Sequence, residues 1–365
     1  MATPETTEAS GLTVTIAGPP GGRRHCVGRG CRTFVIAEAG VNHDGRLDTA
    51  RRLVDAAADA GADAVKFQVF RAADLVTPAA AAAAYQRAGC GARSQREMLE
   101  RLELTDEALR ALREHAARRS MVFLATPFSL GDLRRLSALD VPAIKIASTD
   151  LTHAPLLEAA AATGRTVILS TGASTSEEID ASVQWLIGRV GRTRLALMHC
   201  VSCYPTPVTA INLRAIGSLG RRYGVPCGLS DHTTSTRMGG LAVAAGAALL
   251  EKHFTLDRSA PGPDHAMSLD PGQLADYVAA AREAEGALGS GAIGMTDLER
   301  EVRTVAGRSV VAAAALPAGT LLTADLLALK RPGTGLPAAA LPRLIGRRIR
   351  VAVRSDTIMS WDMVE

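Results

Sequence analysis

Short apolar runs alternate with amphipathic stretches from about Thr33 to Leu288. Eight of the runs are almost continuously apolar, which is typical of strands in a parallel sheet that helices cover on both faces. They are Phe34–Glu38, Ala64–Gln68, Val122–Thr126, Ala143–Ile146, Val167–Ser170, Leu195–His199, Cys227–Ser230 and Leu249–His253. The stretches between them have helical periodicity, most clearly Leu47–Ala60, Asp106–Arg118, Glu177–Val190, Met238–Ala245 and Leu274–Leu288.

Eight strand–helix units in about 250 residues predict a (β/α)₈ barrel, that is, an α/β TIM barrel. The alternative is an open doubly wound sheet, but no Gly-rich dinucleotide fingerprint follows the first strand. From Arg308 onward, short β-like runs at Ser309–Ala315 and Ile349–Val353 are broken by prolines and glycines. We therefore expect an N-terminal extension (1–30), a barrel domain (31–290), a linker (291–306) and a small β-rich domain (307–365) that leans on a larger surface.

Composition and charge narrow the range of partners. The net charge of +4 is small for 365 residues, which argues against nucleic acid as the main partner. No apolar run reaches the roughly 18–20 residues that a membrane helix needs. Met1–Ser10 lack the basic and apolar stretches of a secretory signal. We therefore expect a cytoplasmic protein.

The six cysteines are spread along the chain and do not suggest a disulfide framework, so we expect reduced thiols. Cys200 and Cys203 form a CxxC pair. A redox or zinc role for this pair is a minor alternative, because no second pair stands at metal-binding spacing.

Polar side chains accumulate where the predicted strands end, which is the catalytic face of a barrel. They include Glu38, Lys66, Gln68, Thr126, Lys145, Ser148, Ser170, Tyr204, Ser230, His232, Glu251 and His253. Any one of them could be a capping serine or a satisfied core histidine. Eight polar strand ends in an otherwise apolar set indicate an active site instead.

Lys66 and Lys145 stand inside apolar strands, where an ammonium group needs an anionic partner. With Ser148 and Ser170 nearby, they predict a cradle for a phosphate or carboxylate. In the structural alternative, the two lysines pair with the chain's own Glu38 or Glu251.

His232 and His253 end neighbouring strands and could share a divalent cation that leaves positions open for substrate oxygens. A Lewis acid beside an anion cradle suits the condensation of a phosphorylated enol with an aldehyde, in which Glu38 could handle protons. The residues alone do not decide the reaction, because phosphate-sugar isomerases and aldolases fit the same inventory.

Several longer motifs resemble the sialic acid synthase family. They are Ile36–His43 (IAEAGVNH), Val65–Gln68 (VKFQ), Ala125–Phe128 (ATPF), Tyr204–Pro207 (YPTP), Leu229–Thr233 (LSDHT), Glu251–Thr255 (EKHFT), Pro261–His265 (PGPDH) and Lys330–Gly333 (KRPG). The likeness runs from about Thr33 to the C-terminus, where the last segment resembles an antifreeze-like (SAF) domain.

The resemblance implies that phosphoenolpyruvate condenses with an open-chain N-acylated hexosamine and that phosphate leaves. It places His232 and His253 as ligands of Mn²⁺ or Mg²⁺ and Glu38 as the proton-transfer group. Around the phosphoenolpyruvate it places Lys66, Thr126, Lys145, Ser148, Ser170 and Ser230. Around the two substrates it places Gln68, Tyr204, Glu251 and Asp264. It also implies a domain-swapped homodimer in which Arg331 reaches the partner subunit's site.

Two positions depart from the family pattern. Ser202 stands where some N-acetylneuraminate synthases carry an asparagine against the acceptor sugar, and Ala39 replaces a commoner isoleucine. The acceptor therefore stays open between N-acetylmannosamine and a 2,4-diacetamido-6-deoxyhexose. One alternative is a synthase for a phosphorylated aldose, although no second cationic cluster is visible. A non-catalytic carbohydrate- or ice-binding protein would not need the barrel residues.

Overall fold

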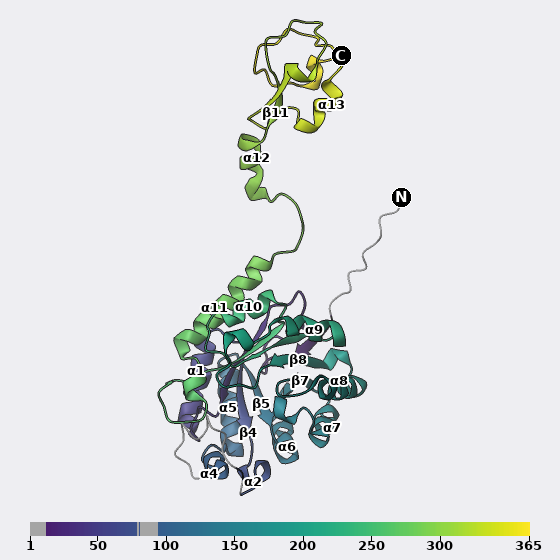
Figure 1. Ribbon diagram of the computed structural model, residues 1–365. Helices are drawn as coiled ribbons and strands as arrows, with labels where there is room; N and C mark the ends of the chain where they lie inside the picture. Colours follow the sequence, from purple (N-terminus) through teal and green to yellow (C-terminus); the bar gives the residue numbers. More distant parts are fainter. Residues whose placement is uncertain (1–11, 79, 81–93) are drawn as a thin grey trace. The chain divides into compact units, whose positions relative to one another are not determined.

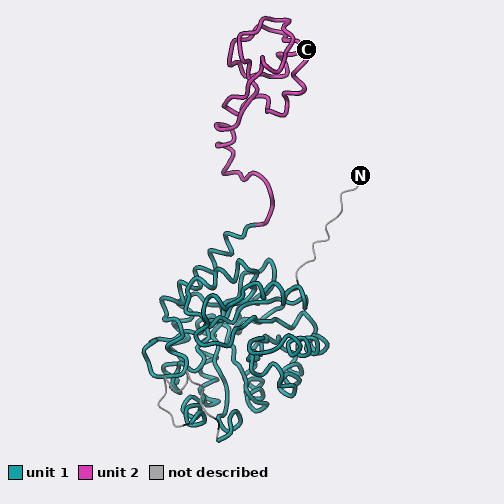
Figure 2. The backbone as a smooth tube through the Cα atoms, viewed as in Figure 1, with its two compact units in different colours: residues 1–289 teal, residues 290–365 magenta. Residues whose placement is uncertain are grey.

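The structure is a computed structural model that describes residues 12–78, 80 and 94–365. The chain divides into two compact units, Met1–Gly289 and Ser290–Glu365, which Figure 2 shows in different colours. Each unit has a hydrophobic core of its own. Among the described residues, no helix combines the length and the apolar character needed to cross a membrane.

The first unit is built around one parallel sheet. In the described part of the chain its eight strands are β3 (Phe34–Gly40), β4 (Ala64–Val69), β5 (Val122–Pro127), β6 (Ala143–Ile146), β7 (Thr166–Ser170), β8 (Leu195–Cys200), β9 (Cys227–Asp231) and β10 (Leu249–His253). Their order is β5-β4-β3-β10-β9-β8-β7-β6, and the two end strands β5 and β6 also contact each other. The sheet is therefore a nearly closed barrel, and the predicted fold class is confirmed.

Helices follow the strands and surround the sheet (Figure 1). The longer ones are α1 (Leu47–Asp59), α5 (Asp106–Arg118), α6 (Leu130–Ala138), α7 (Ala154–Ala162), α8 (Ser176–Val190), α9 (Arg214–Tyr223), α10 (Met238–Ala244) and α11 (Pro271–Leu288). Polar caps fix several of their starts: Thr175 and Glu178 form a capping box at α8, and Asp270 and Gln273 form one at α11. Two short helices, α2 (Ala72–Leu75) and α4 (Gln95–Glu100), lie between β4 and α5.

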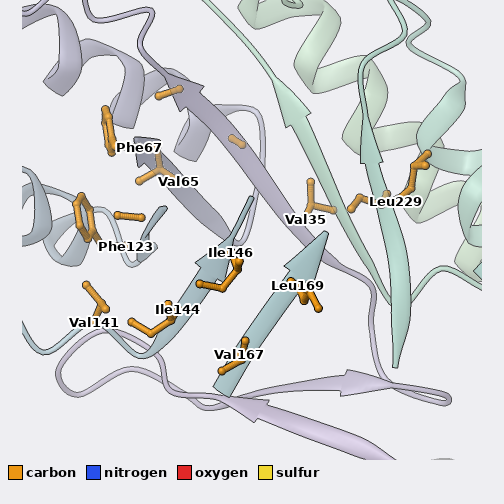
Figure 3. Close-up of a cluster of buried hydrophobic side chains, with 14 of the residues drawn as sticks. Val35, Val65, Phe67, Phe123, Val141, Ile144, Ile146, Val167, Leu169 and Leu229 are labelled. Atoms are coloured by element: carbon orange, nitrogen blue, oxygen red, sulfur yellow. The ribbon is translucent and has the colours of Figure 1, made fainter. Parts of the chain in front are cut away.

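Alternate residues of each strand face two different cores. One set, which includes Val35, Phe67 and Ile144, packs with the helices, and Figure 3 shows its side chains on neighbouring strands. The other set, which includes Ile36 and Leu124, forms a separate cluster inside the barrel. Because both sets are apolar at the beginnings of the strands, the sequence reads as continuous apolar runs.

A hairpin of β1 (Thr13–Ile16) and β2 (His25–Gly28) covers the amino end of the barrel. Its Val14, Ile16 and Val27 belong to the interior cluster, and the Thr166 hydroxyl donates a hydrogen bond to the Thr15 carbonyl at 2.9 Å. The segment expected as an extension thus contributes to the barrel core. Cys26 of β2 and Cys31 form a disulfide, so the expectation that the cysteines are reduced is wrong for this pair.

The second unit contains α12 (Arg300–Ala306) and an antiparallel pair of strands, β11 (Ser309–Ala312) and β12 (Leu327–Lys330). A compact apolar cluster lies beneath them. The predicted strand at Ile349–Val353 is wrong: Ile349 and Val353 make isolated bridges only. Backbone pairing in this unit is broken into short pieces, which agrees with its many prolines and glycines.

Candidate active site

The interior face of the barrel changes from apolar to polar along each strand. On β3, β4 and β5, for example, the inward residues Ile36, Ala64 and Leu124 are each followed two positions later by a buried polar residue. The polar residues at this level, all buried, are Glu38, Lys66, Thr126, Lys145, Ser170, Ser230 and Glu251. The structure therefore brings these predicted site residues together at the carboxyl ends of the strands.

Lys66 is held by groups from three neighbouring strands. Its Nζ lies 2.8 Å from Glu38 Oε2 and donates to Thr126 Oγ1 at 3.0 Å. Glu251 Oε2 lies farther away, at 3.7 Å. The structural alternative for the lysines is thus present: Lys66 does have carboxylate partners in the protein.

Lys145 has a looser environment. Its Nζ donates to Ser170 Oγ at 2.7 Å and to the Ile146 carbonyl at 3.2 Å, and it lies 3.7 Å from Glu251 Oε2. The other oxygen of Glu251 accepts a hydrogen bond from Ser230 Oγ at 3.0 Å. Glu251 therefore stands between the two ammonium groups, and its Oε2 has no hydrogen-bond partner among the described residues.

The two buried glutamates, Glu38 and Glu251, differ in pKa because the nearby lysines act on them differently. Burial raises the pKa of Glu38 to about 7, an effect that Lys66 opposes and the Glu251 carboxylate adds to. Burial also acts to raise the pKa of Glu251, but Lys145 and Lys66 together lower it below its usual value. For Lys145, burial lowers the pKa of the ammonium group. A carboxyl group poised near neutrality thus faces an ionised one across Lys66.

His232 and His253 lie next to each other, with ring centroids 5.5 Å apart. The Nδ1 of His232 faces the Val201 carbonyl oxygen at 3.0 Å, so in the neutral ring this nitrogen carries the proton and Nε2 keeps its lone pair. The Nδ1 of His253 is buried without a hydrogen-bond partner among the described residues. Burial lowers the pKa of His253 well below its usual value, so the ring is neutral.

Burial acts to lower the pKa of His232, but Cys200 and the Val201 carbonyl raise it above its usual value. Two adjacent imidazoles fit a divalent cation, which binds histidine in its neutral form. In the described part of the chain, no group of three or more His, Cys, Asp or Glu side chains has the geometry of a complete metal site. Asp264 is the nearest further candidate, since its Oδ2 lies 3.7 Å from His253 Nδ1. The protein therefore offers two ligands and leaves the remaining positions to water or substrate.

Asp264 and Gln68 approach Glu38 beside Gly40. Gln68 Nε2 donates to Glu38 Oε1 at 3.3 Å. A Cβ built on Gly40 would lie 3.3 Å from Glu38 Oε1 and 3.5 Å from both Asp264 Oδ2 and Gln68 Nε2. Gly40 also has a φ of 55°, which favours glycine. Burial raises the pKa of Asp264 to about 6.

Ser148 and Ser202 meet at Gly172, a position that sequence reasoning did not single out. A Cβ built on Gly172 would lie 2.5 Å from Ser202 Oγ, 2.8 Å from Cys200 Sγ and 3.0 Å from Ser148 Oγ. Only a glycine leaves room for these polar atoms. Cys200 was also missed as a site residue, although it is buried at the end of an inward-facing row. The Ser-Thr-Gly sequence that ends β7 was the available signal.

Tyr204 completes this side of the site. Its ring lies 4.3 Å from that of His232, measured between centroids. Arg331 belongs to the second unit, where it is exposed and makes no hydrogen bond or ion pair with the described residues. Every other predicted site residue lies in the barrel.

Comparisons with known proteins identify the family of this chain. The NeuB family model matches residues 53–293, and the SAF domain model matches residues 307–365. The N,N'-diacetyllegionaminic acid synthase of Legionella pneumophila is 38% identical over 91% of this chain and 94% of its own length. The N-acetylneuraminate-9-phosphate synthase of Homo sapiens is 32% identical over 91% of this chain and 92% of its own length.

Solved structures agree with these sequence matches. The sialic acid synthetase of Leptospira borgpetersenii superposes with a TM-score of 0.69 at 34% identity, covering 79% of this chain and 96% of that one. The resemblance to sialic acid synthases is thus confirmed at family level and extends over nearly the whole chain. The chain belongs to the NeuB family of synthases and carries a SAF domain at its C-terminal end.

Proposed function

We propose that this enzyme condenses phosphoenolpyruvate with an open-chain N-acylated hexosamine to give a nine-carbon 3-deoxy-ulosonic acid and phosphate. The acceptor is N-acetylmannosamine or a 2,4-diacetamido-6-deoxyhexose. The observation that carries the proposal is the pair of buried lysines, Lys66 and Lys145, on either side of Glu251, together with the adjacent His232 and His253. Full-length relatives named as synthases of sialic acids support the same reaction.

Lys66 and Lys145 bind the phosphate and the carboxylate of phosphoenolpyruvate. A trianionic ligand offers both ammonium groups a closer partner than Glu251, which lies 3.7 Å from each of them. The hydroxyl groups of Thr126, Ser148, Ser170 and Ser230 add hydrogen bonds around the ligand. The lysines' pairing with Glu38 and Glu251 keeps them ionised before the substrate arrives.

In the reaction, C3 of phosphoenolpyruvate forms a bond with the aldehyde carbon of the sugar, and the aldehyde oxygen takes up a proton. Water adds to the cation that develops at C2 and gives up a proton, and the bond between C2 and the phosphate oxygen then breaks. Glu38 carries the proton transfers, because a carboxyl group with a pKa of about 7 can both give and accept a proton near neutral pH.

His232 and His253 hold a Mn²⁺ or Mg²⁺ ion through their free nitrogens. When bound, the ion supplies Lewis acidity toward the aldehyde oxygen. The chain's own contribution is to hold both imidazoles in place and, by burial, to keep His253 neutral. The Val201 carbonyl orients His232 and fixes its tautomer.

The acceptor sugar lies against Gln68, Ser202, Tyr204 and Asp264. Arg331 meets its N-acyl group from a partner subunit, which makes the enzyme a domain-swapped homodimer. Arg331 is exposed and has free donors within the described part of its own unit, which supports such a role. The apolar side chains of Ile293 and Leu298 are also almost fully exposed, as expected of a segment that a partner covers.

A phosphorylated aldose is the rival acceptor, because one curated relative is named N-acetylneuraminate-9-phosphate synthase. C9 of such a product is C6 of the acceptor, so that enzyme takes a 6-phosphorylated sugar. None of the barrel residues that we place against the acceptor, Gln68, Ser202, Tyr204 and Asp264, is cationic, which favours an unphosphorylated acceptor. We place the reaction in the cytoplasm, where phosphoenolpyruvate is formed.

The test is a panel assay of phosphate release from phosphoenolpyruvate. N-acetylmannosamine, its 6-phosphate and a 2,4-diacetamido-6-deoxyhexose are compared with and without Mn²⁺, and products are identified by mass. We expect turnover only with metal and an unphosphorylated N-acylated sugar. Faster turnover with the 6-phosphate would overturn the acceptor assignment, and no turnover with any aldose would overturn the reaction.

A further inference from the structure

A cavity lies at the other end of the barrel from Lys66 and Lys145. It has a volume of about 530 Å³. Its walls come from residues that precede or begin β5, β6, β7 and β8 and from the loop of the β1–β2 hairpin. The charged residues that line it are Arg24, Arg113, Asp140, Arg165 and Arg194. The proposed condensation uses none of them.

Two of the arginines are held in place while keeping donors free. Arg194 donates from Nη1 to the Gly164 carbonyl at 2.9 Å and from Nε to the Val190 carbonyl at 3.1 Å. Arg165 donates from Nη2 to Asp140 Oδ1 at 3.0 Å. A guanidinium group has five N–H donors, so each fork still has several to offer a ligand.

Positive charge in the cavity is not balanced. Asp140 is the one carboxylate among four guanidinium groups, and 83% of its side chain is exposed. Arg113 approaches it only loosely, at 4.0 Å. Arg24 makes no hydrogen bond or ion pair with the described residues. Unpaired guanidinium groups in a concave site attract anions.

A smaller cavity of about 300 Å³ extends the positive region. Arg24 lines it together with Arg23 and Arg32. Its one carboxylate, Asp63, is already engaged, because it pairs with Arg32 and, at 2.8 Å, with Arg282. Arg24 thus stands between two basic hollows.

We propose that the larger cavity binds a mononucleotide-sized phosphorylated anion. Arginine forks match the oxygens of a phosphate group, and 530 Å³ lies within the range of small-ligand pockets, roughly 300–1,000 Å³. Beside the arginines the walls are mixed: Thr15, Thr166 and Thr193 also line the cavity, and Pro19, Pro142 and Phe123 offer apolar surface to the uncharged body of the ligand. Such a ligand contacts both the hairpin and the starts of the barrel strands.

The test uses AMP as the probe and the full-length Lys145→Met variant, in which the anion cradle at the other end is weakened. Titration calorimetry in EDTA separates binding from any metal effect. We expect one AMP per chain in this variant, and no binding of adenosine, which lacks the phosphate. If AMP does not bind to the Lys145→Met variant, the proposal is overturned. Any AMP binding to the wild type would then be binding to the anion cradle of the active site.

Two further substitutions locate the site. Adding Arg24→Ala and Arg113→Ala to the Lys145→Met variant removes two weakly held guanidinium groups: Arg24 has no hydrogen bond or ion pair with the described residues, and Arg113 makes a long hydrogen bond, at 3.5 Å, to the Asp140 carbonyl. We expect AMP affinity to fall at least about tenfold, as for the loss of charge-assisted hydrogen bonds. Arg51→Ala, an exposed arginine of α1, is the matched control and leaves the affinity unchanged. An equal loss of AMP affinity in the Arg24→Ala/Arg113→Ala variant and in the Arg51→Ala control, or no loss in either, would contradict the assignment.

Discussion

Lys252 Nζ lies 2.9 Å from Asp231 Oδ2, and each of these residues is the sequence neighbour of one of the two site histidines. Because strand residues alternate, Lys252 and Asp231 point away from the barrel interior and toward the helices. Lys252 Nζ lies 5.5 Å from the centre of the Tyr277 ring of α11. Lys252 also donates to the Thr233 carbonyl. This fully buried pair joins β9 to β10 directly behind His232 and His253.

Breaking this pair will destabilise the barrel. Lys252→Met leaves the Asp231 carboxylate buried without its cation, so we expect a loss of about 3 kcal/mol in the free energy of unfolding. Urea titrations of the barrel unit measure it. The double variant Lys252→Met/Asp231→Leu should recover part of the loss. Arg46→Ala, which breaks the exposed pair with Asp48, is the control and should cost under about 1 kcal/mol.

Glu38 predicts a stability that falls with rising pH. Its pKa is about 7 in the folded protein and near 4.5 in the unfolded chain, so between these values the folded state binds the extra proton. The contribution of Glu38 is present below pH 4.5 and is lost as pH rises to about 7. Comparing urea unfolding of wild type and Glu38→Gln in EDTA at pH 5 and pH 8 tests this. A stability difference that is the same at both pH values would contradict it.

The histidine pair predicts metal-dependent thermal stability. After EDTA treatment, Mn²⁺ should raise the unfolding midpoint of the wild type, because an ion that binds only the folded state stabilises it. His253→Ala and His232→Ala should remove this shift while leaving the metal-free midpoint close to wild type. His115→Asn, a surface histidine bonded to Asp55, serves as the control. A full Mn²⁺ shift in both site variants would show that the ion binds elsewhere.

Lys145 should matter for phosphoenolpyruvate far more than for the sugar. Lys145→Met removes the charge and keeps the length of the side chain. We expect the dissociation constant of phosphoenolpyruvate to rise about tenfold to a hundredfold, the range for lost charge-assisted hydrogen bonds. Calorimetric titration of each substrate provides the comparison, with Lys330→Met in the second unit as the control. Equal losses for both substrates would point to a general defect of the barrel.

Arg331 provides a test of subunit exchange. An Arg331→Ala chain should be nearly inactive yet dimeric, and so should a Lys145→Met chain. In a mixed dimer, one site combines an intact barrel with an intact arginine, so activity should return to about half the wild-type value per heterodimer. Analytical ultracentrifugation and rates after mixing provide the data. Exchange without recovered activity would show that Arg331 does not act across the interface.

The barrel strands were predictable because parallel strands buried on both faces leave continuous apolar runs. β6 and β10 begin and end at the predicted residues, and β3 continues to Gly40, beyond the predicted end. The direction of each side chain was less accessible, because both faces are apolar until the last residues of each strand. The partners of Lys66 illustrate this limit: substrate anion and protein carboxylate remained alternatives until Glu38 and Glu251 were placed in space.

Other features depend on contacts between distant segments. The β1–β2 hairpin was missed, although two short runs separated by Pro19, Pro20 and three glycines were a usable turn signal. The Cys26–Cys31 disulfide was missed because spacing alone does not reveal pairing in a long chain. The ion pair of Lys252 and Asp231 was not predicted, because the interpretation of these two strands concentrated on the adjacent histidines.

The barrel interior has two levels: an apolar one against the hairpin of β1 and β2 and a polar one at the carboxyl ends of the strands. Val14, Ile16 and Val27 complete the lower, apolar level, which stabilises the fold through hydrophobic packing. Above it, the buried ionisable residues are costly to fold, and the lower level offsets that cost. A substitution confined to the polar level therefore leaves the apolar packing of the lower level in place. Loss of the β1–β2 hairpin would remove its share of this apolar packing. The same substitution among the buried ionisable residues would then leave a smaller free energy of unfolding.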